Sequence, residues 1–203
     1  EGTIDVGGKN GIGILGIAYR TDTAGSPKVN EFGGKPGEGK VTILNKGKVT
    51  LNGEGATGIF AKNNKAGSNA TNATATNDAT GILTLSVNKS VGMSGEKSTL
   101  TNTGTINIQG QESTGMFAKD SSEMTNNGTI NLVDSASADK PNIGMFTEDK
   151  NTVIHNNKDI IGGNNTYGIY GKTINLGATG QIKVGDNSVG IFSNGEHTAG
   201  STP

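Results

Sequence analysis

The sequence predicts an all-β protein, a parallel β-helix (solenoid) in which each coil is made by one short sequence repeat. Three observations support this fold. A phrase of glycine, then Ile or Met, then usually an aromatic residue recurs seven times; apolar and polar residues alternate upstream of it; and no segment has the spacing of an amphipathic helix. A repeat of this kind is typical of solenoids, in which each coil packs only on its neighbours.

The repeat sets the length of a coil. Its first residues, which we call the key glycines, are Gly13, Gly58, Gly92, Gly115, Gly144, Gly168 and Gly190. Five copies carry an aromatic residue two positions later, namely Phe60, Phe117, Phe146, Tyr170 and Phe192. Successive key glycines are 22 to 45 residues apart, and the wider spacings coincide with polar segments. The sequence therefore predicts coils of about 22–24 residues with loops inserted between some of them.

Upstream of the key glycines, the alternation predicts strands with one buried face. It is seen in Ile4-Asp5-Val6, Ile106-Asn107-Ile108, Ile130-Asn131-Leu132 and Ile174-Asn175-Leu176. We expect two short strands per coil, each paired with its equivalent on the next coil at about 4.8 Å. One inward ladder is then expected to contain Ile4, Val49, Leu83, Ile106, Ile130, Ile160 and Ile182. The aromatic residues of the repeat are expected to form a second buried ladder with stacked rings.

Asparagine and glycine are expected to shape the turns. Asn45, Asn102, Asn126 and Asn156 precede turns, where asparagine tolerates left-handed backbone and can bond to its neighbours along a stack. The key glycine is expected at a tight corner or a positive φ. Antiparallel sandwiches and barrels, the main alternatives, have strands every 8–12 residues or so without this long-range identity. A propeller needs a repeat of about 40–45 residues.

Three segments interrupt the repeat within what we expect to be a single β-helix segment, residues 1–203. They are residues 18–40, 62–80 and 134–142. Such excursions leave one face of a solenoid and are often where binding occurs. We therefore expect 18–40 to be the contact segment and 62–80 to be a tolerated loop. Because neither end has an obvious polar cap, we also expect the chain to be part of a longer protein.

Composition narrows the classes of function. The 203 residues carry a net charge of −1, which gives no electrostatic reason to expect a nucleic acid or an anionic membrane as partner. Cysteine is absent, so a disulfide, a thiolate metal site and a cysteine nucleophile are excluded. No stretch has the length of a transmembrane helix, and residues 1–20 lack the pattern of a signal peptide.

The chemistry of a catalytic site is not evident in the sequence. Acidic residues are spread over different coils: Glu112, Asp120, Glu123, Asp134, Glu148 and Asp186. Asp5, Asp159 and Lys183 occupy outward strand positions, as expected for a solvated face. His155, expected in a turn, and His197 lack the spacing of a metal site. We therefore assign no catalytic, cofactor-binding, metal-ligating or ligand-binding residue, and we expect neither enzyme activity nor a cofactor.

The repeats also resemble a known family. The phrases Gly-Thr-Ile-Asn-Ile, Asn-Asn-Gly-Thr-Ile-Asn-Leu, Ser-Val-Gly-Ile-Phe and Ser-Thr-Gly-Met-Phe-Ala are similar to the passenger repeats of large fusobacterial autotransporter adhesins of the RadD-like type. The similarity covers residues 2–17 and 41–195 apart from the insertions. It implies a long right-handed β-helix passenger at the bacterial cell surface, secreted by the type V route. It also implies a signal peptide and a C-terminal outer-membrane barrel, neither of which lies in this sequence.

Three functions follow as hypotheses. The first is a non-enzymatic adhesin shaft that supports cell adhesion and coaggregation as a monomeric segment. Its partner would be a host or bacterial cell-surface protein or glycan, with no nucleic acid and no membrane contact of its own. The second is a polysaccharide-degrading β-helix lyase or glycosidase, and the third is a trimeric binding protein like a phage tailspike.

Overall fold

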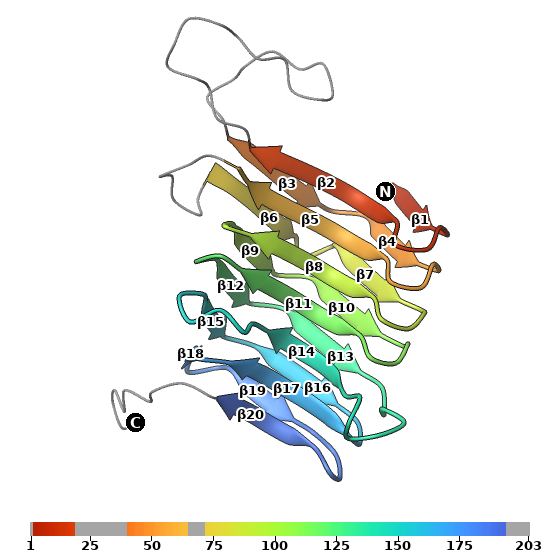
Figure 1. Ribbon diagram of the computed structural model, residues 1–203, viewed down its shortest axis with the longest axis vertical. Helices are drawn as coiled ribbons and strands as arrows, with labels where there is room; N and C mark the ends of the chain where they lie inside the picture. The colour runs from red at the N-terminus through yellow and green to blue at the C-terminus, as the bar shows by residue number, and fades with distance from the viewer. Residues whose placement is uncertain (1, 19–39, 65–71, 194–203) are drawn as a thin grey trace, which may run out of the picture.

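The chain forms a right-handed parallel β-helix, as the sequence predicts. The structure, a computed structural model, describes residues 2–18, 40–64 and 72–193. Within these residues the strands form three parallel sheets that run along the axis of the stack (Figure 1). Each full coil contributes one strand to each sheet, in the chain order C, A, B.

The strands are short and recur in the same order. Sheet A contains β1 (Thr3–Val6), β4 (Lys48–Leu51), β7 (Ile82–Leu85), β10 (Thr105–Ile108), β13 (Thr129–Leu132), β16 (Asp159–Gly162) and β19 (Gln181–Lys183). Sheet B contains β2 (Ile12–Ala18), β5 (Thr57–Asn63), β8 (Val91–Glu96), β11 (Thr114–Lys119), β14 (Asn142–Phe146), β17 (Thr166–Gly171) and β20 (Val189–Ser193). Sheet C contains β3 (Val41–Asn45), β6 (Ala73–Asn77), β9 (Thr99–Asn102), β12 (Glu123–Asn126), β15 (Val153–Asn156) and β18 (Thr173–Leu176).

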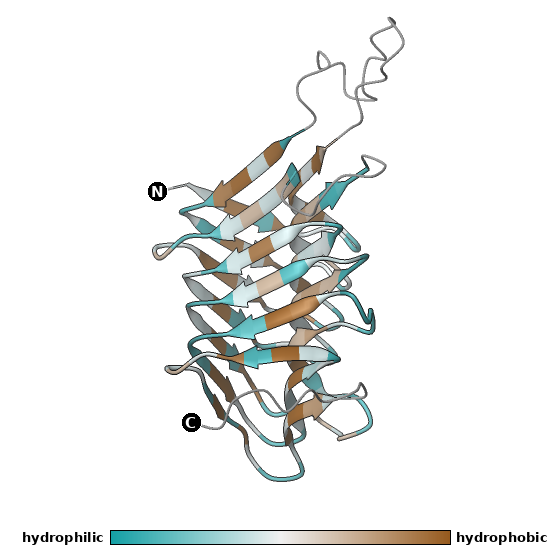
Figure 2. Ribbon diagram, turned by 90° about the vertical axis from the view of Figure 1, so that its left-hand side faces the viewer, coloured by the Kyte–Doolittle hydropathy of each residue, from teal (hydrophilic) through white to brown (hydrophobic). Residues whose placement is uncertain are grey.

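The predicted aliphatic ladder is confirmed in every step. The strand register of sheet A aligns the equivalent residues of successive coils, namely Ile4, Val49, Leu83, Ile106, Ile130, Ile160 and Ile182. The middle members are almost fully buried, and exposure rises only at the ends of the stack, to 36% at Ile4. Within single strands, bands of hydrophobic and more polar residues follow one another along the chain (Figure 2). The core is therefore a column of aliphatic side chains one layer thick.

The expectation of two strands per coil is wrong, because each full coil has three. The additional strand is the one in sheet C, whose inward residues include Leu100, Met124 and Ile154, all fully buried and in register. It ends in the asparagine that the sequence places before a turn. Three strands enclose a triangular core, in which every sheet faces the other two.

A row of buried asparagines joins successive coils at the corner between sheets C and A. The Nδ2 atom of each donates to the Oδ1 atom of the next, at 2.8 Å from Asn45 to Asn77 and from Asn77 to Asn102. The row continues through Asn126 to Asn156 at 2.9 Å. The predicted bonding along the stack is confirmed, but the φ angles of these residues are not positive. These bonds satisfy polar groups that burial would otherwise make costly.

The key glycines were expected at corners, but they lie inside the strands of sheet B with no positive φ. Glycine is needed there because successive coils approach closely. A Cβ atom on Gly115 would lie 2.6 Å from the carbonyl oxygen of Gly144 and 3.0 Å from Cγ2 of Ile130. Equivalent clashes with the glycine of the next coil recur from Gly13 to Gly168. The repeated glycine therefore sets the contact distance between coils.

At the corner between sheets A and B, positive φ angles occur instead three residues before every key glycine except Gly144. The residues are Asn10 (56°), Gly55 (74°), Lys89 (59°), Glu112 (54°), Asn165 (55°) and Asn187 (53°). Asparagine and glycine adopt this conformation at low cost, whereas lysine and glutamate do so with strain. The corner thus keeps its shape where the side chain changes.

The three predicted excursions differ in outcome. Of residues 18–40, the part from 19 to 39 lies outside the described residues. The prediction of a loop over 62–80 is wrong at both ends, because Asn63 belongs to β5 and Ala73–Asn77 form β6 in register with β3 and β9. Residues 133–141 connect β13 to β14, so the predicted excursion 134–142 falls in this connection except for Asn142, which is already part of β14.

We predict that Gly115→Ala destabilises the protein by about 3 kcal/mol or more, because the added methyl group meets backbone that cannot move without separating two coils. Gly190→Ala is the matched control, since the nearest atom to its Cβ would be Cγ2 of Ile182 at 3.9 Å. Thermal and urea unfolding followed by circular dichroism measure both. Equal losses of stability in the two variants would contradict the role of the glycine in coil contact.

We also predict that Leu176→Asn stabilises the protein by about 1 kcal/mol. The Nδ2 atom of Asn156 is buried without a hydrogen-bond partner, and Leu176 occupies the next position of the row while being 52% exposed. An asparagine there supplies the missing acceptor. Leu176→Ala removes the same leucine without adding an acceptor, so its melting temperature should not rise.

Candidate interaction face

The outer faces of the three sheets differ in chemistry. Along the middle of sheet A the outward residues are mainly Thr105, Asn107, Thr129 and Asn131. Sheet C carries outward threonines and, further along, Glu123 and His155. Such side chains are typical of solvated sheet faces. Sheet B is the exception, because most of its outward side chains are apolar or aromatic.

We define the sheet B face by two rows of outward residues. The first row precedes the key glycines and contains Ile12, Thr57, Val91, Thr114, Ile143, Tyr167 and Val189. The second row follows them by two residues and contains Leu15, Phe60, Ser94, Phe117, Phe146, Tyr170 and Phe192. None of these residues is charged. A long apolar surface of this kind marks a site of interaction.

The aromatic side chains of the second row form a ladder. Ring centroids are 5.6 Å apart from Phe117 to Phe146, 5.1 Å from Phe146 to Tyr170 and 4.8 Å from Tyr170 to Phe192. The last pair is stacked with an angle of 24° between the ring planes. Tyr167 of the first row also stacks on Phe192, at 6.4 Å.

The expected ladder of rings is confirmed, with stacking at Tyr170–Phe192, a tilted contact of 33° at Phe117–Phe146 and an edge contact of 75° at Phe146–Tyr170. The expectation that the aromatic ladder is buried is wrong. The residue that follows each key glycine points inward; Met93, Met116 and Met145 at this position are fully buried. Strand alternation then turns the next residue, the aromatic one, outward. The rings are half-buried by one another, and Phe192 at the end of the ladder is 40% exposed.

A short row of charges borders this face where the strands of sheet B end. Glu96 lies in register with Lys62 on one side and Lys119 on the other. Its carboxylate oxygens lie 2.6 Å from Nζ of Lys62 and 3.0 Å from Nζ of Lys119. Partial burial alone would raise the pKa of Glu96, but hydrogen bonds and charge from the two lysines outweigh it and lower that pKa. The same bond raises the pKa of Lys119.

The sequence reasoning missed this group, although a signal for it exists. The fourth residue after each of the first six key glycines reads Ile17, Lys62, Glu96, Lys119, Glu148 and Lys172. Opposite charges thus alternate from one coil to the next over five positions. Cross-strand ion pairs of opposite sign stabilise neighbouring strands.

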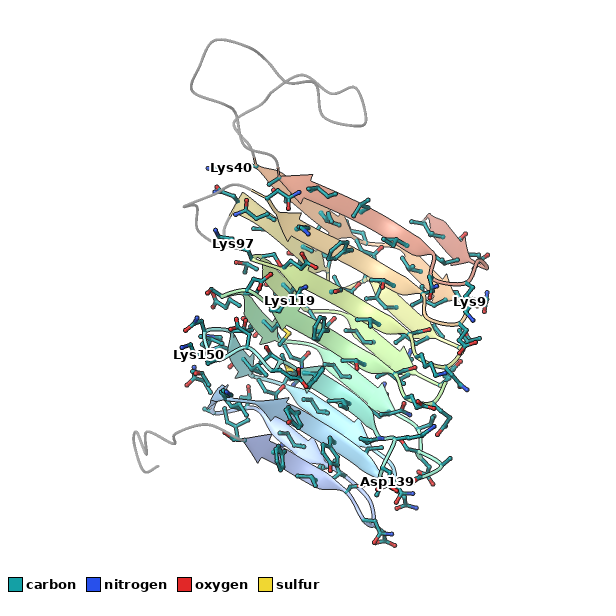
Figure 3. All side chains as sticks on the ribbon, viewed as in Figure 1. Lys9, Lys40, Lys97, Lys119, Asp139 and Lys150 are labelled. Carbon is teal, nitrogen blue, oxygen red and sulfur yellow. The ribbon has the colours of Figure 1, made fainter. Side chains whose placement is uncertain are left out.

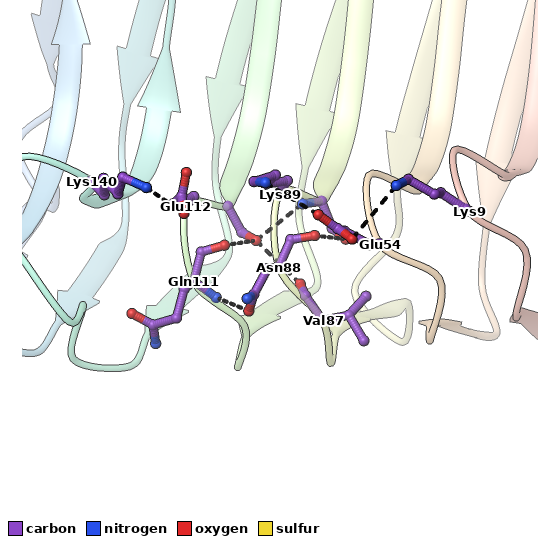
Figure 4. Close-up of polar contacts among 10 residues, drawn as sticks. Lys9, Glu54, Val87, Asn88, Lys89, Gln111, Glu112 and Lys140 are labelled. Atoms are coloured by element: carbon purple, nitrogen blue, oxygen red, sulfur yellow. Dashed lines mark hydrogen bonds and ion pairs between the residues drawn. The ribbon is translucent and has the colours of Figure 1, made fainter.

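Charged and polar side chains also follow the corner between sheets A and B (Figure 4). Glu54 pairs with Lys9 at 3.9 Å and with Lys89 at 3.2 Å, and Glu112 pairs with Lys140 at 3.5 Å. Figure 3 places Lys9 and Asp139 at this edge of the stack and Lys97 and Lys150 at the opposite edge. The sheet B face therefore lies between two charged borders.

The connection from β13 to β14 is fixed to the neighbouring coils. The side chain of Gln111 donates to the carbonyl oxygen of Asp134 at 3.0 Å and accepts from the backbone N–H of Ala136 at 2.7 Å. The carboxylate of Asp134 accepts from the backbone N–H of Asn164 at 3.0 Å. These hydrogen bonds fix the insertion to the coils on both sides of it.

The charged residues named from the sequence lie on different surfaces. Asp5, Asp159 and Lys183 belong to strands of sheet A, Glu112 and Asp134 to the corner between sheets A and B, and Glu123 to sheet C. Among the described residues, no three histidine or acidic side chains gather where a metal ion would fit. No helix within the described ranges has the length and hydrophobicity to cross a bilayer.

The two histidines were expected to lack a binding role. The prediction that His155 lies in a turn is wrong, because it lies in β15. Its Nε2 atom is 3.4 Å from a carboxylate oxygen of Glu123, and its Nδ1 atom is 3.4 Å from Nδ2 of Asn175. These contacts are exposed neighbours on the outer face of sheet C. His197 lies outside the described residues.

We predict that Glu96→Gln lowers the stability of the protein at neutral pH. The variant should also lose less stability than the unmodified chain when the pH is lowered. The lowered pKa of Glu96 means that its stabilising effect is present above the unfolded-state pKa and is lost as the pH falls through the folded-state pKa. Melting temperatures from neutral pH to about pH 2 test this. Glu112→Gln, which breaks a longer and more exposed ion pair, is the control. It should change the dependence of the melting temperature on pH less than Glu96→Gln does.

Comparison with known families agrees with this architecture. The family model described as the BigA third pectate lyase-like domain matches residues 1–159. No curated protein and no solved structure matches the chain. The matched region includes all strands from β1 to β15 and most of the sheet B face. This chain belongs to the family of BigA third pectate lyase-like domains.

Proposed function

We propose that the chain is a non-catalytic segment of a bacterial surface adhesin, whose β-helix holds the sheet B face toward partner surfaces. The observation that carries this proposal is the face itself, whose two rows are mainly apolar or aromatic and carry no charge over the seven strands of sheet B. A surface that is exposed, flat and apolar is stabilised by covering it with another surface.

Family membership supports a place at the cell surface. BigA is an autotransporter-like surface protein. The resemblance to RadD-like passengers also supports a place at the cell surface, and it suggests adhesion and coaggregation as the role of the protein. The partner is then a cell-surface protein or glycoconjugate with an apolar contact area.

A polysaccharide lyase or glycosidase is the alternative that the family description raises, since some families with this fold are enzymes. Proton abstraction needs a carboxylate or another base whose pKa is matched to the reaction. Glu96, the most shielded carboxylate in the ion pairs described above, is held by two lysines that lower its pKa, as in a structural ion pair. Reproducible release of sugar products from a panel of polysaccharides would overturn the non-catalytic proposal.

A second proposed contact is the segment 18–40, which interrupts the repeat. Deletion of residues 20–38 tests it separately from the sheet B face. If adhesion persists after this deletion while the β-sheet circular dichroism signal is unchanged, the segment is not the contact.

We predict that beads coated with the chain adhere to epithelial or bacterial cells and that Phe117→Lys combined with Tyr170→Lys reduces adhesion at least about tenfold. The two lysines add charge to a face that must lose water on contact. Thr105→Lys combined with Thr129→Lys is the matched control, with the same change of charge on the outer face of sheet A. Equal adhesion of both variants would contradict the role of the sheet B face.

A further inference from the structure

The sheet B face has the same spacing at every coil. Its strands pair in register from β2 to β20, so the two outward rows repeat at about 4.8 Å along the axis. The ring centroids follow this spacing, at 4.8 to 5.6 Å. A partner that contacts every coil equally well must carry apolar groups at the same period. Another β-helix with the same repeat meets this condition.

The chemistry of the face disfavours two other classes of partner. Stacking on a sugar needs an open ring face, and at the C-terminal end of the ladder Tyr170 and Phe192 each cover one face of the other. Attraction to an anionic lipid surface needs lysine or arginine on the contact area. The two rows carry no charge, so the face fits a flat apolar protein surface.

The dimensions are adequate for a specific contact between two copies. Seven strands span about 30 Å along the axis, and two rows of side chains cover a width of about 15 Å. Each copy would then bury about 500 Å², or about 1,000 Å² for the pair, which lies at the low end of specific interfaces.

Details of the face suit pairing with itself. Ser94 lies in register between Phe60 and Phe117, so one rung of the ladder lacks a ring. An aromatic ring of a facing copy can occupy this position. The bordering row of Lys62, Glu96 and Lys119 contains both signs of charge, and the chain has a net charge of −1, so two copies meet without strong repulsion.

We propose that two copies of this chain pair through their sheet B faces, with the aromatic ladder of each packed against that of the other. This inference rests on the proposed function, because it uses the same sheet B face. It names the partner as a second copy of the chain, on the same cell or on a facing cell. It departs from the expectation, drawn from the sequence, that the segment is monomeric.

Sedimentation equilibrium of the purified chain tests the proposal. The unmodified chain is expected to show a concentration-dependent dimer. Phe117→Lys combined with Tyr170→Lys should raise the dissociation constant at least about tenfold. Thr105→Lys combined with Thr129→Lys should leave it unchanged. Circular dichroism melting confirms that each variant is folded.

Cysteine labelling locates the contact, because the chain contains no cysteine of its own. Thr114→Cys places a thiol in the first row of the face, and Thr105→Cys places one on sheet A in the same coil. Maleimide labelling of Thr114→Cys should slow as protein concentration rises through the dimer range. Labelling of Thr105→Cys should keep the same rate.

The outcomes separate this inference from the proposed function. A folded chain that remains monomeric, or a dimer that the sheet B lysines leave intact, overturns the self-pairing. A stable trimer would also overturn it and favour the tailspike-like alternative. If the chain is monomeric yet the sheet B lysines abolish adhesion to cells that lack this protein, the adhesin proposal stands and the second copy is not the partner.

Discussion

Every coil of this protein must place its backbone directly over that of the coil before it, at the spacing of paired strands. The key glycines are where this constraint is tightest, because the carbonyl oxygen of one coil occupies the space that a Cβ atom of the previous coil would need. The aliphatic ladder, the asparagine row and the aromatic ladder all depend on this contact, since each exists only while equivalent residues stay in register. Register in a parallel sheet buried on one side is strongly specified for the same reason.

The aliphatic ladder could be predicted residue by residue, because a repeat aligns its own equivalent positions. The side of the sheet on which the aromatic residues lie could not. That prediction requires knowing that the glycine and the following residue both lie on the inner side, which the pattern of hydrophobicity does not encode. The place of Asn77 in the asparagine row could not be predicted for another reason. The polar composition of residues 62–80 resembles that of a loop, although Ala73–Asn77 form a strand in register with β3.

The same short sequence can serve two sheets. Thr-Ile-Asn-Leu forms β13 in sheet A at residues 129–132 and β18 in sheet C at residues 173–176. Local sequence favours a strand in both places, and the two copies differ in their place in the coil: β13 follows the sheet C strand β12, whereas β18 precedes the sheet A strand β19. The charge group around Glu96 lay in the sequence as an alternation across coils, and only the fold shows that its members touch. The chemistry of the sheet B face likewise emerges only once outward and inward positions are known.

The asparagine row has a direction. Each amide donates toward the C-terminal end of the stack and accepts from the N-terminal side, so the amide dipoles of Asn45 through Asn156 add along the axis. Aligned hydrogen bonds polarise one another, and the row therefore gives the β-helix an electrical polarity comparable in kind to that of an α-helix. Its donor end lies at Asn156, where the next coil places Leu176 instead of an acceptor, so a partial positive charge remains uncompensated within the stack.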